Sequence, residues 1–351
     1  MSTIAGTSTG VGLSVYGLDV AVEGDWPEVI EQVGRDFAWF GSTGPGNPAG
    51  DRRPSSRRAS PAVRIEIQRR PPDYARYQDL GQSFVTPRNV VYSDGDHSAI
   101  DYFGIALSAY DRRRGALLIQ GEDSDLVHEA AYQFLLSRIG DHLDAIRMPR
   151  IHALGVVGAQ GATALFLPSG GGKSTLALRA LRDDDIRLLS EDSPLLDRRG
   201  MMHPFPLRIG INPHQADELP EGHVRRLSRM EFHPKLALDL DAYMDRVERA
   251  AQPLAHIVIG ERSLASSPSL EPLRRSAAVA TLLREVVVGV GLYQGMEFVF
   301  QRGPGDIVGR ARPALVRALC CAAGLRRAAV WRLRLGRDQE RNWALLRRLL
   351  V

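Results

Sequence analysis

Residues 167–175 read Leu167-Pro168-Ser169-Gly170-Gly171-Gly172-Lys173-Ser174-Thr175. This stretch is a glycine-rich turn that follows an apolar run at 162–167 and precedes a helical pattern at 176–181. A strand, a glycine-rich loop and a helix in this order form the setting of a phosphate-binding loop. In that setting, backbone N–H groups and the N-terminus of the helix face a bound anion, which the helix dipole stabilises.

The residues after the glycines carry the predicted chemistry. We expect Lys173 to reach the β- and γ-phosphates of a nucleotide and the Ser174 hydroxyl to bind Mg²⁺. The usual pattern begins with a glycine six residues before the lysine, where this chain has Leu167. A glycine-rich turn that binds nothing is therefore the alternative. The predicted nucleotide-binding residues are Ser169, Gly170, Gly171, Gly172, Lys173, Ser174 and Thr175.

Lysine is rare in this chain. Of its 45 lysine and arginine residues, only Lys173 and Lys235 are lysines, and the other 43 are arginines. An ammonium group is a compact point charge on a flexible stem, unlike the planar guanidinium fork. A lysine that persists in such a background marks a position where that chemistry is needed. Lys235 is therefore a candidate phosphate or substrate contact, and a chance surface residue is the alternative.

Composition narrows the class of protein. The 351 residues are enough for two domains, and 44% hydrophobic with 25% charged residues is typical of soluble globular proteins. The net charge is +4, but acids and bases are interspersed and no nucleic-acid motif accompanies them, so we expect no nucleic-acid partner. The adjacent Cys320 and Cys321 are typical of buried thiols in a reducing compartment. No signal peptide or membrane-spanning run is apparent, which predicts a cytoplasmic protein without a membrane partner.

Residues 1–147 are expected to form an N-terminal α+β domain. Helical spacing of apolar residues covers 26–40 and 125–147. Residues 41–61 are rich in Gly, Ser, Pro and Arg and have almost nothing apolar to bury, so they are predicted to be a disordered loop. The expected strands are 13–20, 63–68, 89–93, 99–107 and 116–120.

Residues 148–351 are expected to form the second domain, which contains the glycine-rich loop. Besides the helix after that loop, we expect helices at 314–323 and from Arg337 onward. The region between 211 and 314 is expected to be mixed and helical. The expected strands are 151–157, 162–167, 186–189, 194–196, 207–211 and 329–335.

An acidic pair, Glu191-Asp192, follows the strand that comes after the loop helix. In nucleoside triphosphate enzymes an acid so placed holds Mg²⁺ or accepts a proton from the attacking hydroxyl. We expect Ser174 and Asp192 to be the Mg²⁺ ligands. An acidic pair alone is usually a turn, but the nearby glycine-rich loop favours the catalytic interpretation. The competing cluster, Asp183-Asp184-Asp185, lies at the far end of the strand and is expected to be a solvated turn.

These elements resemble the catalytic domain of bacterial HPr kinase/phosphorylase. The resemblance is carried by His152 at the start of a strand, by the Ser-Gly-x-Gly-Lys-Ser pattern at 169–174, and by the Glu191-Asp192 pair. It covers about residues 148–215. It implies a P-loop (Walker A) α/β core similar to the nucleotide core of phosphoenolpyruvate carboxykinase. It also implies that Asp192 or Glu191 is the general base and that His152 lies close to the phosphates.

The chain departs from the family pattern at several positions. Leu167-Pro168 replaces Gly-Asp, Thr175 stands where the regulators have an acid, and Glu191 replaces an Asp. The N-terminal domain does not match the family. The resemblance therefore implies a diverged HPr-kinase-like member, a group that includes kinases of peptide natural products such as lasso-peptide precursors.

The predicted function is ATP- or GTP-dependent phosphoryl transfer, with Mg²⁺, to a hydroxyl group. The acceptor is expected to be Ser or Thr of a peptide or protein, including a natural-product precursor, with a small-molecule hydroxyl as an alternative. A nucleotide-binding regulatory or carrier module with little turnover is the alternative from another class. Arg208 and Lys235 are the candidate substrate contacts, and the resemblance favours a homo-oligomer.

Overall fold

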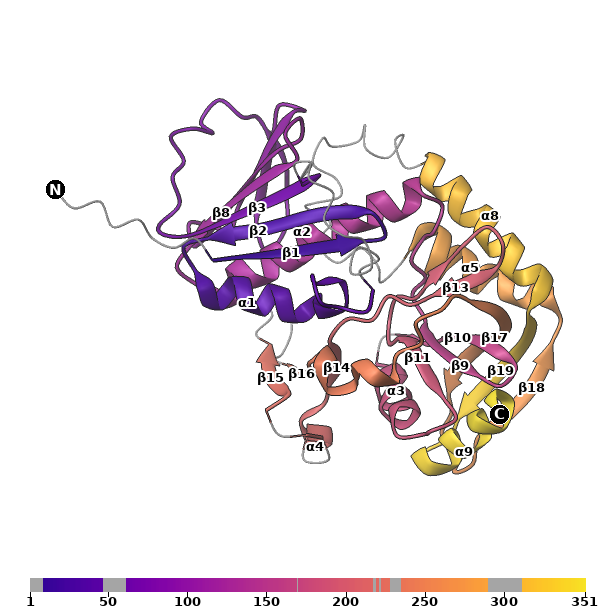
Figure 1. The fold of residues 1–351 in the computed structure, drawn as a ribbon. Helices are drawn as coiled ribbons and strands as arrows, with labels where there is room; N and C mark the ends of the chain where they lie inside the picture. Colours follow the sequence, from indigo (N-terminus) through magenta and orange to yellow (C-terminus); the bar gives the residue numbers. More distant parts are fainter. Residues whose placement is uncertain are drawn as a thin grey trace. The chain divides into compact units, whose positions relative to one another are not determined.

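The computed structural model describes residues 9–46, 61–168, 170–216, 219–220, 222–227, 235–289 and 311–351. These residues form a mixed α/β structure with several sheets and helices (Figure 1). They divide into two compact units. In the described part of the chain, unit 1 comprises residues 9–139 and 212–241, and unit 2 comprises 140–211, 242–289 and 311–351.

This division differs from the one predicted from the sequence, which placed the domain boundary between residues 147 and 148. The first change of unit falls between residues 139 and 140, inside helix α2 (Ser124–Ala145). Residues 212–241, which the sequence analysis placed in the second domain, cluster with unit 1. The units are therefore not contiguous in sequence.

An ion-pair network within unit 1 holds the inserted segment. Arg225 pairs with Asp36, which is fully buried, and its Nε donates to Asp239 at 2.6 Å. Asp36 also lies 2.9 Å from Nε2 of His128. A buried carboxylate needs such partners because desolvation penalises its charge. Arg225, which is partly buried, therefore ties the segment 212–241 to residues 9–139 of unit 1.

Unit 1 is built on a sheet of eight strands in its described part. The pairs β2–β3 and β3–β8 are parallel, and the other neighbours are antiparallel. In sheet order the strands are β1 (Thr9–Val15), β2 (Leu18–Gly24), β3 (Val63–Arg69), β8 (Ala116–Gly121), β7 (Ala106–Asp111), β6 (His97–Asp101), β5 (Val90–Ser93) and β4 (Gln82–Val85). Its other elements are α1 (Pro27–Asp36), η1 (Ala38–Phe40), most of α2, α4 (Pro213–Ala216), β15 (Val224–Leu227) and β16 (Lys235–Leu238).

Two predicted strands of unit 1 are hairpins. The predicted strand 13–20 is interrupted at Tyr16 and Gly17, with φ of 50° and 90°, and the strand 99–107 is interrupted at Phe103 and Gly104, with φ of 51° and 83°. Positive φ at two successive residues is typical of tight hairpin turns. A two-residue turn leaves the alternation of apolar residues almost unbroken, so periodicity alone could not locate it. Strand β4 was not predicted.

The predicted disordered loop at 41–61 falls largely outside the described residues, which omit 47–60. Its first residues form turns. The N–H of Gly44 donates to the carbonyl of Gly41, and the N–H of Gly46 donates to the carbonyl of Trp39, both at 2.9 Å. Trp39 is buried, so residues 41–46 are anchored to the core of unit 1.

Unit 2 is built on a mixed sheet whose central strand is β17 (Gln252–Arg262), which pairs in parallel with β10 and β19. The sequence analysis placed these residues in the mixed helical region, and that prediction was wrong. Central strands covered on both faces show continuous apolar runs, which periodicity cannot distinguish from helix. The other strands are β9 (Leu154–Gly158), β10 (Gly161–Phe166), β11 (Arg187–Ser190), β12 (Leu195–Leu196), β13 (Met201–His203), β18 (Ser269–Leu273) and β19 (Ala329–Leu335), with β14 (Ile209–Ile211) beside α3.

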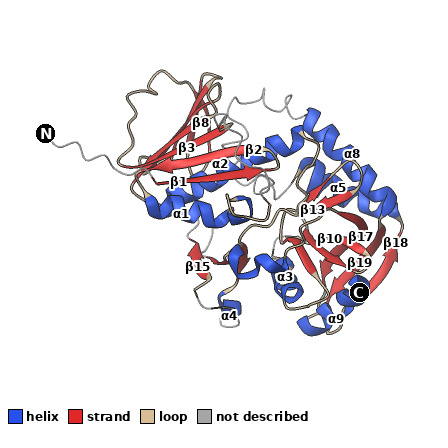
Figure 2. Ribbon diagram, in the orientation of Figure 1, coloured by secondary structure: helices blue, strands red, loops and turns tan. Residues whose placement is uncertain are grey.

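Helices surround this sheet (Figure 2). Helix α3 (Lys173–Leu181) contacts β9 and β11, and α9 (Gln339–Leu350) contacts β18 and β19. Helix α8 (Ala311–Arg327) and the π-helix η5 (Leu283–Val288) contact each other and bury Cys320, Cys321 and Val286 in the core. Short helices are η3 (Leu240–Arg246), η4 (Arg275–Ala278) and α5 (Val279–Leu282). No helix in the described part of the chain is long and apolar enough to cross a membrane.

Candidate functional site

The glycine-rich loop connects β10 to α3, as its sequence predicted (Figure 1). Gly170 and Gly172 have φ of 71° and 108°, a region that favours glycine. The N–H of Gly171 donates to the carbonyl of Pro168 at 2.8 Å, and a Cβ at Gly171 would lie 2.7 Å from that oxygen. All three glycines are thus required by local geometry. Ser169 lies outside the described residues.

The N-terminus of α3 lies in this loop. Gly172 is its N-cap and offers no side-chain acceptor, so the N-cap residue satisfies none of the N–H groups of the first turn. Arg262, the last residue of β17, donates from Nε to the carbonyl of Gly171 at 3.2 Å. The loop therefore has a helix N-terminus and a guanidinium beside it, both of which favour an anion.

Lys173 is folded onto three neighbours within unit 2. Its side chain is 7% exposed, and Nζ lies 2.7 Å from Nε2 of His152, 3.1 Å from the carbonyl of Leu167 and 3.2 Å from Oδ1 of Asp192. The structure thus brings together the loop lysine, the histidine and an acid of the predicted pair.

His152 lies between two carboxylates. Its Nδ1 is 2.7 Å from Oε2 of Glu285, and its Nε2 is 3.2 Å from Oδ1 of Asp192. Burial alone would lower the pKa of His152, but the hydrogen bonds and charges of Asp192 and Glu285 outweigh burial and raise the pKa. Nε2 of the protonated imidazole donates to Asp192, and Nε2 can accept from Lys173 only in the neutral form whose proton lies on Nδ1, where Glu285 accepts it.

Glu191 and Asp192 have opposite pKa shifts. Burial, reinforced by the charge of Asp192, raises the pKa of Glu191 to about 7. Desolvation alone would raise the pKa of Asp192, but the hydrogen bond from His152 and the charge of Lys173 outweigh it and lower that pKa to about 2. The Ser174 hydroxyl donates to Oε1 of Glu191 at 2.7 Å. At neutral pH, Asp192 is therefore the ionised acid of the pair, and its side chain remains 39% exposed.

Backbone hydrogen bonds fix this acidic pair next to His152. After β11, the N–H of Ser193 donates to Oγ of Ser190 at 3.1 Å and closes a turn. The N–H of Ala153 donates to the carbonyl of Asp192 at 3.2 Å. The N–H of His152 donates to the carbonyl of Glu285 at 3.3 Å. The strand end, the histidine and η5 are thus connected through the main chain as well as through side chains.

Sequence reasoning missed Glu285 and Arg262. Glu285 is 5% exposed, and Arg284 donates to its other carboxylate oxygen at 2.6 Å. An acid at the start of the apolar run 286–288 was the available signal, because a carboxylate inside an apolar helix needs a partner. π-Helical turns such as η5 often occur at functional sites. Arg262 could not be found because β17 itself was not predicted.

The remaining predicted residues lie in α3, directly before β14 and at the start of β16. Arg208 directly precedes β14, which contacts α3. Lys235 opens β16 in unit 1, where its backbone pairs with that of Leu227. Thr175 lies in the first turn of α3.

The competing acids are ion-paired and not merely solvated. Asp183 and Asp185 pair with Arg347, at 2.5 Å and 2.6 Å, and Asp184 pairs with Arg246 at 2.9 Å. All of these partners belong to unit 2. The Asp183–Asp185 cluster therefore serves to hold chain segments together.

The donor set near the loop fits a magnesium ion. Within the described ranges, no group of three or more His, Cys, Asp or Glu side chains is arranged to hold a metal. Mg²⁺ does not need one, because it is usually held by one or two carboxylates together with substrate phosphates and water. Ser174 and Glu191 offer neighbouring oxygens of the kind that Mg²⁺ prefers. The predicted ligand Asp192 instead contacts His152 and Lys173, so Glu191 takes its place beside Ser174.

Comparison with known proteins gives no further guide to function. No family model matches the chain, and no curated protein matches it significantly.

Proposed function

We propose that unit 2 is a diverged HPr-kinase-like P-loop kinase, which transfers a phosphoryl group from ATP or GTP, with Mg²⁺, to a hydroxyl group. The observation that carries this proposal is the contact of Lys173 with both His152 and Asp192, at 2.7 Å and 3.2 Å. It unites a phosphate-binding cation and an ionised acid within one cluster.

The nucleotide end of the site is supported by charge and backbone geometry. The glycine-rich loop, the N-terminus of α3, Lys173 and Arg262 all favour negative charge at one place. Ser174 and Glu191 would hold Mg²⁺, which when bound supplies charge neutralisation to the phosphates. This distribution is what phosphoryl transfer requires, because its catalysis is mainly positioning and electrostatic stabilisation.

The acceptor end is supported by Asp192. Because its pKa is low and its side chain is partly exposed, Asp192 is charged and accessible, whereas Glu191 is engaged by Ser174. We therefore assign the general base to Asp192. It takes the proton of the acceptor hydroxyl while the new O–P bond forms and the bond between the transferred phosphorus and the nucleotide oxygen breaks. Lys173 stabilises the charge on the leaving phosphate.

The proposed acceptor is Ser or Thr of a peptide or protein, such as a natural-product precursor, or a small-molecule hydroxyl. A homo-oligomer is proposed from the family resemblance alone. A second candidate function, a nucleotide-binding module with little turnover, is favoured by one observation. Lys173 is already engaged by His152 and the carbonyl of Leu167, so it must be released before it reaches a phosphate.

Two substitutions test the kinase proposal. Lys173→Ala should weaken ATP binding at least about tenfold in calorimetry, because a charge-assisted contact contributes roughly 1.5–3 kcal/mol. Asp192→Asn should leave ATP binding largely intact and lower phosphoryl transfer about 10²–10⁴-fold. Transfer is followed with γ-labelled ATP and a pool of Ser/Thr peptides and small alcohols.

The matched control is Asp184→Asn, which neutralises an acid of the same unit whose side chain is 97% exposed. It should change neither ATP binding nor transfer. Equal ATP affinity in wild type and Lys173→Ala would refute the proposed nucleotide site. ATP binding that depends on Lys173, without transfer or hydrolysis by the wild type, would establish the binding module instead.

A further inference from the structure

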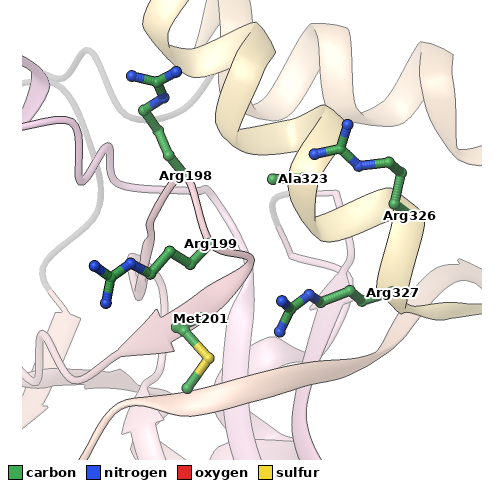
Figure 3. A pocket seen from close by; sticks show the side chains of 6 residues that line it. All are labelled: Arg198, Arg199, Met201, Ala323, Arg326 and Arg327. Carbon is green, nitrogen blue, oxygen red and sulfur yellow. The ribbon is translucent and has the colours of Figure 1, made fainter.

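A cavity of unit 2 lies outside the Lys173 cluster and shares no residue with it. It has a volume of about 440 Å³, and Figure 3 shows the side chains that line it. Four of these are arginines from two separate elements. Arg198 and Arg199 lie on the turn between β12 and β13, and Arg326 and Arg327 lie in the last turn of α8. In Figure 3, the two helix arginines extend from α8 toward the turn.

The turn is hydrogen-bonded to β17 and lies close to α8. The N–H of Gly200 donates to the carbonyl of Asp197, and the N–H of Leu254 on β17 donates to the carbonyl of Gly200, both at 3.0 Å. Gly200 has φ of 73°, and a Cβ there would lie 3.1 Å from the carbonyl oxygen of Ala323. Close backbone contact therefore fixes the positions from which the two arginine pairs extend.

The positive charge of this cavity is not compensated. Within the part of the chain that the structure describes, none of the four guanidinium groups makes a hydrogen bond or an ion pair. The adjacent acid is engaged elsewhere. Oδ1 of Asp197 accepts the N–H groups of Arg199 and Met201, at 2.8 Å and 2.9 Å, and its Oδ2 lies 3.1 Å from His203.

Other arginines of unit 2 do have carboxylate partners. Arg317, also on α8, pairs with Asp144 through two hydrogen bonds of 3.0 Å and 2.7 Å. Two of the cavity arginines, Arg326 and Arg327, can be explained by the dipole of α8, because cations near a helix C-terminus stabilise the helix. It does not account for Arg198 and Arg199, which belong to a turn.

We propose that this cavity binds a small organic anion that carries at least two phosphate groups. The planar guanidinium fork is suited to phosphate oxygens. Four guanidinium groups can bind more than one phosphate. Met201 and Ala323 add an apolar wall for the carbon skeleton. The cavity volume lies within the range of small-molecule sites. The four side chains are long and exposed, so their charged ends can turn toward a common ligand.

Calorimetry with bisphosphoglycerate on the full chain tests the proposal. The double variant Arg198→Gln/Arg327→Gln should bind this probe at least about tenfold more weakly than the wild type, because each lost charge-assisted contact reduces affinity about tenfold or more. The second pair, Arg199→Gln/Arg326→Gln, should give a similar loss. The substituted side chains are exposed, and an unchanged melting temperature verifies folding of each variant.

The control variant, Arg337→Gln/Arg348→Gln, removes the same charge from two exposed arginines of unit 2 and should bind the probe as the wild type does. Lys173→Ala should also retain probe binding, so this result is independent of the proposed kinase site. Absence of saturable binding to the wild type, or equal losses in the control and the cavity variants, would overturn the proposal.

Discussion

Nζ of Lys173 lies 2.7 Å from Nε2 of His152, so the loop lysine is held by the histidine at the other end of the cluster. The same histidine is fixed through Nδ1 by Glu285. His152 thus helps to place Lys173, together with Asp192 and the carbonyl of Leu167. A carboxylate that sequence reasoning did not single out thus contacts the histidine that neighbours the lysine of the glycine-rich loop.

Replacement of this carboxylate should change the titration of the histidine. In Glu285→Gln, the pKa of His152 should fall, because the hydrogen bond and negative charge that help to raise it are lost. Phosphoryl transfer should fall at least about tenfold, since the amide N–H of Gln favours the wrong imidazole tautomer. NMR titration of the imidazole signals measures the first effect, with the other histidines as internal controls. An unchanged midpoint for His152 would show that Glu285 does not act on it.

Glu191 makes folding stability depend on pH. Its folded pKa of about 7 lies above the ordinary value of 4.5, so the folded state binds a proton more tightly than the unfolded state. The contribution of Glu191 to the free energy of unfolding is therefore fully present below about pH 4.5 and is lost as the pH rises toward 7. Glu191→Gln should remove this decline and stabilise the protein at pH 8 by up to about 3 kcal/mol. Urea unfolding at acidic and alkaline pH measures the free energy of unfolding of the wild type and of Glu191→Gln. The same pH dependence in the two proteins would contradict the prediction.

Gly171 should tolerate no side chain. In Gly171→Ala, the new Cβ would meet the carbonyl oxygen of Pro168 at 2.7 Å, so the loop must open. We expect a loss of unfolding free energy of about 1–3 kcal/mol and a weaker affinity for ATP. Gly210→Ala in the same unit is the control, because a Cβ there meets nothing within 4 Å. Thermal unfolding compares the two variants, and equal melting temperatures would show that the loop accommodates the methyl group.

Lys235 remains a predicted substrate contact. If its position needs a compact ammonium, Lys235→Arg should lower turnover or raise a Michaelis constant despite the retained charge, because the guanidinium is larger and directs its donors differently. Steady-state kinetics of phosphoryl transfer decide the question. Unchanged constants for nucleotide and acceptor would make Lys235 an ordinary surface residue.

Local sequence patterns located most of the candidate site. The glycine-rich loop, the following helix and the strand before Glu191 were recognised because their signals lie within a few residues of each other. Strand β19 was predicted at its observed bounds, 329–335, since it alternates and is flanked by helical segments. The tight hairpin turns were missed because they interrupt the alternation of apolar residues only briefly. The central strand β17 was missed because its apolar run is nearly continuous and shows no alternation.

The sequence by itself determined that residues 167–175 form a loop between a strand and a helix, because glycine conformation and short-range periodicity are local properties. Only the tertiary structure decided that Glu285 and Arg262 join the site. They lie far along the chain from the loop, and their placement depends on how β17 and η5 pack in unit 2. It also decided that Asp192 is the charged acid of the pair, since its pKa depends on His152 and Lys173, which only folding brings into contact with it.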